Sequence, residues 1–224
     1  EEKSHKNLLM SGETPRKMTF PRIFDGSNGG MIPIGGFVDL ETFLKPTFDF
    51  KKLAEIVKVM TINLNNIIDY NYYPTPETKT SNLRHRPIGL GVQGLANVFM
   101  ELKIPFTCNE AKKLNNDIFE TIYYASMEAS MELARDRGEL VKKYKNNESV
   151  SISVIPEEIN RGSHLGSYSS FIGSPLYQGK YQFNLWNYEA SDRYDWLHLM
   201  NNIQLYGVRN SLLVAPMPTA STAQ

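Results

Sequence analysis

Residues 210–224, NSLLVAPMPTASTAQ, combine residue types that suit the binding of a phosphate group. The apolar residues 212–215 have the length of a short buried strand. Pro216 and Pro218 then prevent a regular strand or helix. Small residues follow where a new helix would begin: Thr219, Ala220, Ser221 and Thr222. A strand that runs into such a turn presents free backbone N–H groups to an anion. Because serine and threonine caps are common, an ordinary capped connection is the alternative.

Hydrophobic periodicity predicts three helices before this segment. The first follows a cap at Asp49 and ends near Tyr73. The second spans residues 109–137, with Gly138 expected to end it. The third is expected to follow a cap at Ser191 and to end at Gly207. The apolar stripe of the first helix consists of Leu53, Ile56, Val57, Met60, Leu64, Ile67 and Ile68.

The regions between these helices are predicted to be irregular. Residues 1–36 read as loops, with at most a short strand at residues 31–34. Residues 145–172 are polar and rich in serine, which predicts a long and mobile surface insert. The remaining residues, 37–224, are expected to form one domain.

The triplet Gly89, Gly91 and Gly94 matches the GxGxxG pattern of dinucleotide-binding folds. That fingerprint requires a hydrophobic strand before the first glycine, whereas Arg84, His85, Arg86 and Pro87 stand there. We therefore expect the glycines to let a helix that begins near Leu90 pack closely against a neighbour. The charged residues before them suit either carboxylates or a phosphate.

Several other residues of reactive type have a structural interpretation. Tyr123 and Tyr124 are expected to be core residues, because aromatic side chains at helical spacing usually are. Glu128 and Glu132 lie one helical turn apart, but no Glu-x-x-His accompanies them, so a di-iron site is not expected. Cys108 lies beside a helix cap, and we expect a free structural cysteine there.

The composition excludes several classes of protein. The 24 basic residues balance 24 acidic residues, so no surface for nucleic acid or an anionic membrane is indicated. The single cysteine excludes a disulfide framework and a CxxC metal site. No apolar run approaches the roughly 20 residues that span a bilayer, and the start does not resemble a signal peptide. We expect a cytoplasmic protein and, because no methionine begins it, part of a longer chain.

Six segments together resemble the large, catalytic subunit of class I ribonucleotide reductase of the eukaryotic type. They cover parts of residues 48–144 and 173–224 and occur in the order of that family: FDFKKLAEIVKV, NLNNIIDYNYYP, SNLRHRPIGLGVQGLANVF, LNNDIFETIYYASMEAS, GSPLYQG and YGVRNSLLVAPMPTASTAQ. The resemblance implies a mixed, helix-rich α/β fold that is part of a ten-stranded α/β barrel. It also implies that the substrate diphosphate is held by Pro218, Thr219, Ala220, Ser221 and Thr222.

The family reduces ribonucleoside diphosphates to deoxyribonucleoside diphosphates for DNA synthesis, and the resemblance implies its partners. These are a second large subunit, a small radical-generating subunit that contains metal, and thioredoxin or glutaredoxin as reductant. ATP and dNTP effectors regulate the full enzyme. No metal or cofactor is expected to bind to this segment itself.

One departure from the family concerns its thiols. The reaction generates a thiyl radical and draws electrons from two further cysteines, but the corresponding region here reads SNGGMIPIGGFVDL. Cys108 matches none of these positions. No catalytic residue is therefore assigned, and the chain alone is expected to be inactive. A non-catalytic remnant or regulatory paralogue of the large subunit that keeps the barrel packing and the partner surface is the alternative.

Overall fold

The computed structural model describes most of the chain: residues 24–25, 47–151, 156–160 and 162–218. These residues belong to two compact units, Glu1–Asp49 and Phe50–Gln224. The second unit contains every described helix and the segment before the predicted diphosphate loop.

The described part of the first unit is a two-stranded antiparallel sheet. β1 (Phe24–Asp25) pairs with β2 (Thr47–Phe48), and Phe24 lies opposite Phe48. The expectation that residues 1–36 are irregular is therefore wrong at β1. β1 and its partner β2 are far apart in the sequence, so no local sequence pattern predicts that they pair. The strand predicted at residues 31–34 lies outside the described residues.

α2 (Phe50–Tyr70) confirms the first predicted helix, which starts directly after Asp49. Met60 and Ile67 were predicted for its apolar stripe but are exposed. The buried face includes two polar residues in their place: Leu53, Val57, Thr61, Asn65 and Ile68. This face packs along α5, so α2 brings polar groups into the interior.

Two short helices lie between α2 and α5. α3 (Pro76–His85) begins at a capping box with Thr75 at its N-cap. α4 (Leu95–Glu101) begins after Gly94, which has a φ of 80°. The helix that was predicted to begin near Leu90 is therefore α4, which begins at Leu95.

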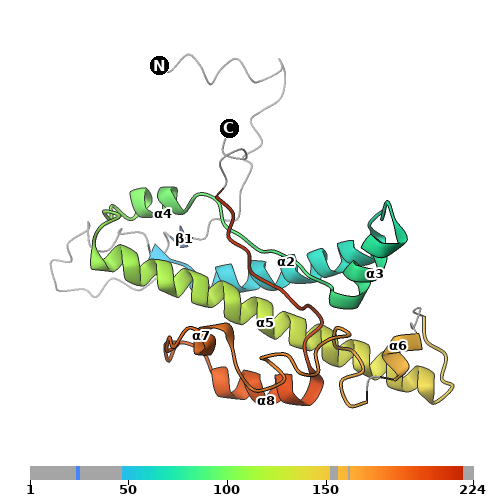
Figure 1. Cartoon of the computed structure of the whole chain (residues 1–224). Coiled ribbons are helices and arrows are strands. Elements are labelled where there is room, and N and C mark those ends of the chain that lie inside the picture. Colours follow the sequence, from blue (N-terminus) through green and yellow to red (C-terminus); the bar gives the residue numbers. More distant parts are fainter. Residues whose placement is uncertain (1–23, 26–46, 152–155, 161, 219–224) are drawn as a thin grey trace, which may run out of the picture. The chain divides into compact units, whose positions relative to one another are not determined.

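α5 (Asn109–Lys145) is the long helix of the second unit, and Figure 1 shows it between α2 and α8. Cys108 caps it as a structural cysteine, because its Sγ accepts a hydrogen bond from the Ala111 N–H at 3.4 Å. Gly138 was predicted to end the helix, but it lies within the helix. A Cβ on Gly166 would lie 2.6 Å from the Gly138 nitrogen. Gly138 therefore marks a close approach of a later segment.

α8 (Trp196–Tyr206) packs against α5 and confirms the third predicted helix. Its N-cap is Asp195, whose side chain accepts a hydrogen bond from the first turn. The predicted cap, Ser191, lies too early in the chain. Gly207 ends the helix as predicted, with a φ of 76°.

The predicted surface insert at residues 145–172 is wrong for much of its described part. α6 (Pro156–Ile159) carries Glu158, whose side chain is fully buried. Tyr168 and Phe171 belong to the hydrophobic core. The sequence misleads here because the buried residues are separated by serine and glycine, so they follow neither a helical nor a strand period.

The hydrophobic core lies where α5, α8 and the neighbouring loops meet. α7 (Gln182–Leu185) adds Phe183 at its edge. The buried core residues come from all these parts: Met127, Met131, Tyr168, Phe171, Tyr181, Leu199, Ile203, Val208 and Leu213.

The described residues are rich in helix and poor in strand. Besides β1 and β2, they contain one isolated parallel bridge, between Leu90 and Val214. The helix-rich character is thus confirmed, whereas a barrel sheet is not seen in the described part. None of the helices described is long and apolar enough to cross a membrane.

Candidate functional site

The segment that leads into the predicted diphosphate loop pairs in parallel with residues 88–90. The Leu90 N–H donates to the Leu213 carbonyl at 2.7 Å, and the Ala215 N–H donates to the Leu90 carbonyl at 2.8 Å. The Ile88 N–H donates to the Leu212 carbonyl at 3.1 Å. Of the apolar residues predicted as a buried strand, Leu213 is buried, while Leu212 is 64% exposed. The predicted buried strand is therefore only partly present, as an extended segment with one parallel bridge and partial burial.

The structure reaches the first residue of the predicted diphosphate site. Pro218 is described and exposed. Thr219, Ala220, Ser221 and Thr222 lie outside the described residues, so their role stays a prediction.

Two glycines of the GxGxxG triplet serve the close approach of this segment. A Cβ on Gly89 would lie 3.1 Å from the Ala215 Cβ, and one on Gly91 would lie 3.3 Å from the Ala215 carbonyl oxygen. These distances are tight for a side chain. The predicted close packing is therefore present, but residues 89–91 are extended, whereas a helix that begins near Leu90 was expected to make the contact. The close approach of residue 215 therefore explains these two glycines of the GxGxxG pattern, and no bound dinucleotide is needed to explain them.

Asn210 anchors the start of the segment to α5. Its backbone N–H donates to the Ser130 Oγ at 3.0 Å, and the Ser130 Oγ donates to the Asn210 Oδ1 at 3.0 Å. The Arg209 N–H adds a bond to the Ser130 carbonyl at 2.9 Å. Asn210 and Ser130 are both buried. These bonds satisfy polar groups that would otherwise be costly to bury.

Arg86 anchors the residues on the other side of the parallel pairing. Its guanidinium donates to both oxygens of Asp69, at 2.8 and 2.7 Å, and to the Asn65 Oδ1 at 3.1 and 3.0 Å. The Asn210 Nδ2 donates to the Arg86 carbonyl at 3.0 Å. Arg86 has a φ of 46°, a left-handed conformation that is unusual for a residue with a side chain. The sequence left a carboxylate or a phosphate as the partner of the charged residues before the glycines. For Arg86, the partner is the carboxylate of Asp69.

A second cluster joins Glu158 to two arginines, one of which, Arg209, directly precedes Asn210 in the sequence. The Glu158 carboxylate accepts from the Arg137 Nη2 at 2.6 Å and from the Arg209 Nη1 at 3.0 Å. Burial alone would raise the pKa of Glu158, but the hydrogen bonds and charges of Arg137 and Arg209 hold that pKa below its usual value. Burial, with a smaller effect of the Arg86 charge, lowers the pKa of Arg209 to about 10. The arginine remains charged at neutral pH.

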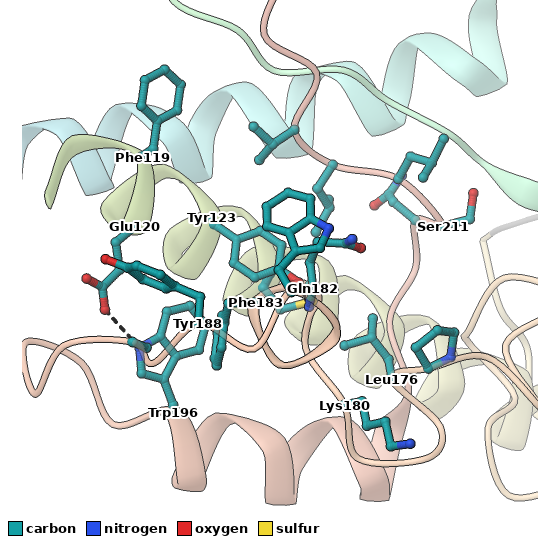
Figure 2. A pocket seen from close by; sticks show the side chains of 18 of the residues that line it. Phe119, Glu120, Tyr123, Leu176, Lys180, Gln182, Phe183, Tyr188, Trp196 and Ser211 are labelled. Carbon is teal, nitrogen blue, oxygen red and sulfur yellow. Dashed lines mark hydrogen bonds between the residues drawn. The ribbon is translucent and has the colours of Figure 1, made fainter. Parts of the chain in front are cut away.

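A cavity of about 730 Å³ lies beside the extended segment. Figure 2 shows Tyr123, Phe183 and Trp196 gathered on one side, away from Ser211. The Trp196 Nε1 donates to the Glu120 Oε1 at 3.1 Å, which fixes the indole in this wall. Aromatic walls of this kind suit an apolar group better than a phosphate.

With this geometry in place, comparison with known proteins decides the family. The family model "Ribonucleotide reductase, barrel domain" matches residues 34–224. The chain belongs to this family.

Curated relatives of the ribonucleotide reductase segment support the same assignment. The ribonucleoside-diphosphate reductase large subunit of Caenorhabditis elegans is 52% identical over 177 residues, 79% of this chain and 19% of the relative. The large chain of Schizosaccharomyces pombe is 48% identical over 188 residues, 84% of this chain and 20% of the relative. The large subunit of Plasmodium falciparum is 48% identical over 198 residues, which are 88% of this chain and 21% of the relative. The chain thus spans about a fifth of the length of these relatives.

The structure also reports on the other reactive residues of this ribonucleotide reductase segment. Tyr123 and Tyr124 pack against the hydrophobic core, as predicted. The Tyr124 ring stacks on Tyr194 with 4.4 Å between centroids. Burial first, and the Glu128 charge second, raise the pKa of Tyr124 to about 12. These tyrosines are neutral packing residues at physiological pH.

Glu128 and Glu132, the two carboxylates one helical turn apart, both lie close to a lysine. Glu128 forms an ion pair with Lys58 at 2.6 Å, and Glu132 lies 3.9 Å from the same lysine. Among the described residues, no group of three or more His, Cys, Asp or Glu side chains is placed to hold a metal ion.

Sequence reasoning missed the buried polar residues that hold the extended segment. Ser130, Glu158 and the side-chain role of Asn210 were not identified. One signal was available for the serine: Ser126 and Ser130 lie four residues apart beside Ala125 and Ala129, which indicates a face of small residues on α5. Nothing local indicates that Asn210 is the partner.

Proposed function

We propose that this chain is the substrate-diphosphate segment of a ribonucleoside-diphosphate reductase large subunit. The proposal extends to the reaction of the whole protein, the reduction of ribonucleoside diphosphates to deoxyribonucleoside diphosphates. The observation that carries it is the near 50% identity to reductase large subunits over most of the chain, 52% and 48% in two cases. The family match reaches residue 224 and so includes the predicted loop.

In this function, Pro218 sets the turn, and Thr219, Ala220, Ser221 and Thr222 supply backbone N–H and hydroxyl donors to the diphosphate. Hydrogen bonds from such groups to a charged phosphate are stronger than neutral ones. The extended segment of residues 212–215, paired with residues 88–90, supplies a support for this loop. We also assign the paired segments to the ten-stranded α/β barrel of the family, although the described residues contain only one bridge of it.

The partners follow from the same proposal. The complete protein would work as a large-subunit homodimer with a small radical-generating subunit, thioredoxin or glutaredoxin as reductant, and ATP or dNTP effectors. The metal belongs to the radical-generating subunit, and we assign none to this segment. We place the protein in the cytoplasm, with no nucleic-acid or membrane partner.

The test is Ser221→Ala in the complete large subunit that carries this chain. Loss of a hydrogen bond to a charged group should raise the KM for CDP about tenfold or more. The affinity for the effector nucleotide should not change, because the proposed role of Ser221 concerns only the substrate diphosphate. Steady-state reduction of CDP and equilibrium binding of CDP and effector measure these quantities.

Ser191→Ala is the matched control, because Ser191 is exposed and its side chain accepts a local hydrogen bond from the Arg193 N–H at 3.3 Å. It should leave both the KM and effector binding at wild-type values. An unchanged KM in Ser221→Ala would refute the assignment of the loop.

A further inference from the structure

The parallel pairing that carries the diphosphate loop is short. It rests on the three backbone hydrogen bonds between residues 88–90 and 212–215, with one more from the Ser211 N–H to the His85 carbonyl at 3.1 Å. Register is weakly specified in strands rich in glycine, and Gly89 and Gly91 both lie against Ala215 in this pairing. A slip by one residue turns every side chain to the other face. Another part of the molecule must therefore set the position of this segment.

Ser130 and Asn210 have the geometry to do so. The two residues exchange hydrogen bonds at 3.0 Å in both directions, and both are buried. A slip by one residue would place Arg209 or Ser211 opposite Ser130 and would leave the buried serine hydroxyl and the Asn210 amide without these partners. Buried polar groups that lose their partners cost free energy.

Asn210 also fixes the other side of the pairing. Its Nδ2 donates to the Arg86 carbonyl at 3.0 Å and lies 3.3 Å from the Asn65 Oδ1. Arg86 is itself held by Asp69 and Asn65 on α2. One side chain thus links α5, α2 and both paired segments, immediately before the segment that enters the loop.

We propose that Ser130 and Asn210 are positioning residues for the substrate diphosphate: they set the register of residues 211–217 and thereby place the binding loop that follows. We assign neither residue a contact with the substrate. The proposal rests on the proposed function, because it concerns the same site. Apparent affinity falls with the fraction of molecules whose site is competent, so loss of register lowers affinity for substrate.

Ser126 provides a matched control for Ser130. Both serines are fully buried on α5, one helical turn apart. The Ser126 Oγ donates to the Tyr123 carbonyl of its own helix at 3.1 Å, whereas Ser130 reaches Asn210. Ser126→Ala therefore reproduces the loss of a buried hydroxyl without touching the extended segment. Alanine is smaller than serine and a better helix former, so both variants should fold.

The experiment compares Ser130→Ala, Ser126→Ala and wild type in the complete large subunit. We expect Ser130→Ala to raise both the Kd for CDP, measured without the radical-generating subunit, and the KM for CDP about threefold to tenfold. The kcat at saturating CDP and the Kd for effector should stay at wild-type values. Ser126→Ala should change none of these quantities. Asn210→Ala, which also removes the hydrogen bond to the Arg86 carbonyl, should raise the Kd further.

Each result has one interpretation. Equal Kd values for CDP in Ser130→Ala and Ser126→Ala would overturn the positioning role, as would a loss of kcat without a change in KM. If Ser221→Ala raises the KM but Ser130→Ala does not, the proposed function stands and this inference fails. If Ser221→Ala also has no effect, the proposed function itself fails.

Discussion

At the scale of single residues, Glu158 is the carboxylate on which two arginines depend. Its side chain is fully buried, and those of Arg137 and Arg209 are 19% and 9% exposed. Breaking a buried ion pair by removing one partner costs about 3–5 kcal/mol, because the other charge stays buried. Since the pKa of Glu158 is lower in the folded protein, its stabilising contribution is present above its ordinary pKa of 4.5 and is lost as the pH falls through the folded value.

Glu158→Gln should therefore lower the free energy of unfolding by about 3 kcal/mol or more at pH 7. The difference from wild type should begin to shrink as the pH falls below 4.5, because the unfolded wild-type chain is then protonated at this position. It should be lost as the pH falls further through the lower pKa of Glu158 in the folded protein. Urea unfolding of the chain at a series of decreasing pH values from pH 7 measures both effects.

Glu128→Gln is the control for this prediction. Glu128 pairs with Lys58 at a site where its side chain is 29% exposed. Partly exposed pairs contribute about 0–1 kcal/mol. A similar loss of stability in the two variants would show that the burial of Glu158 is not the cause.

At the scale of elements, the contact between α5 and the segment around Gly166 depends on two glycines, Gly138 and Gly166. A Cβ on Gly166 would overlap the Ala134 carbonyl oxygen, whereas one on Gly138 would lie 3.4 Å from the Gly166 nitrogen. The two glycines face each other but differ in the space that they need. Only Gly166 lacks room for a methyl group.

Gly166→Ala should destabilise the chain by about 3 kcal/mol, because backbone must move to accept the methyl group. Gly138→Ala should be nearly neutral, since the contact is ordinary and alanine favours the helix by about 1 kcal/mol. Thermal unfolding of both variants distinguishes them. Equal effects would mean that the close approach of Gly166 does not limit packing.

At the scale of the whole molecule, the single cysteine limits what this chain can do alone. Cys108 caps α5 through its Sγ, at the start of a helix that packs in the interior. The family reaction implied by the sequence needs a thiyl radical and two further thiols, and one cysteine cannot supply all three.

We therefore expect the purified 224-residue chain to reduce no CDP, even with a radical-generating subunit and a dithiol reductant. Product analysis with a complete reductase as positive control is the measurement. The complete large subunit that carries the chain should be active under the same conditions if its remaining part supplies the thiols. Turnover by the 224-residue chain would contradict the prediction.

The sequence by itself determined the family and the main helices. Six ordered segments indicated a reductase large subunit, and periodicity found α2, α5 and α8, because these depend on residues close together in the chain. It missed the ends that depend on distant partners. Local rules predict a helix end at Gly138, because they cannot anticipate the packing of Gly166 against it.

Only the tertiary structure decided which polar residues are buried and what they hold. Ser130 and Asn210 lie 80 positions apart, and Arg86 and Asn210 lie 124 apart, so no local pattern could pair them. The same holds for the buried residues of the segment predicted as a surface insert. Burial and hydrogen bonding between distant segments are properties of the packed chain, and they position the segment that the sequence could only suggest as functional.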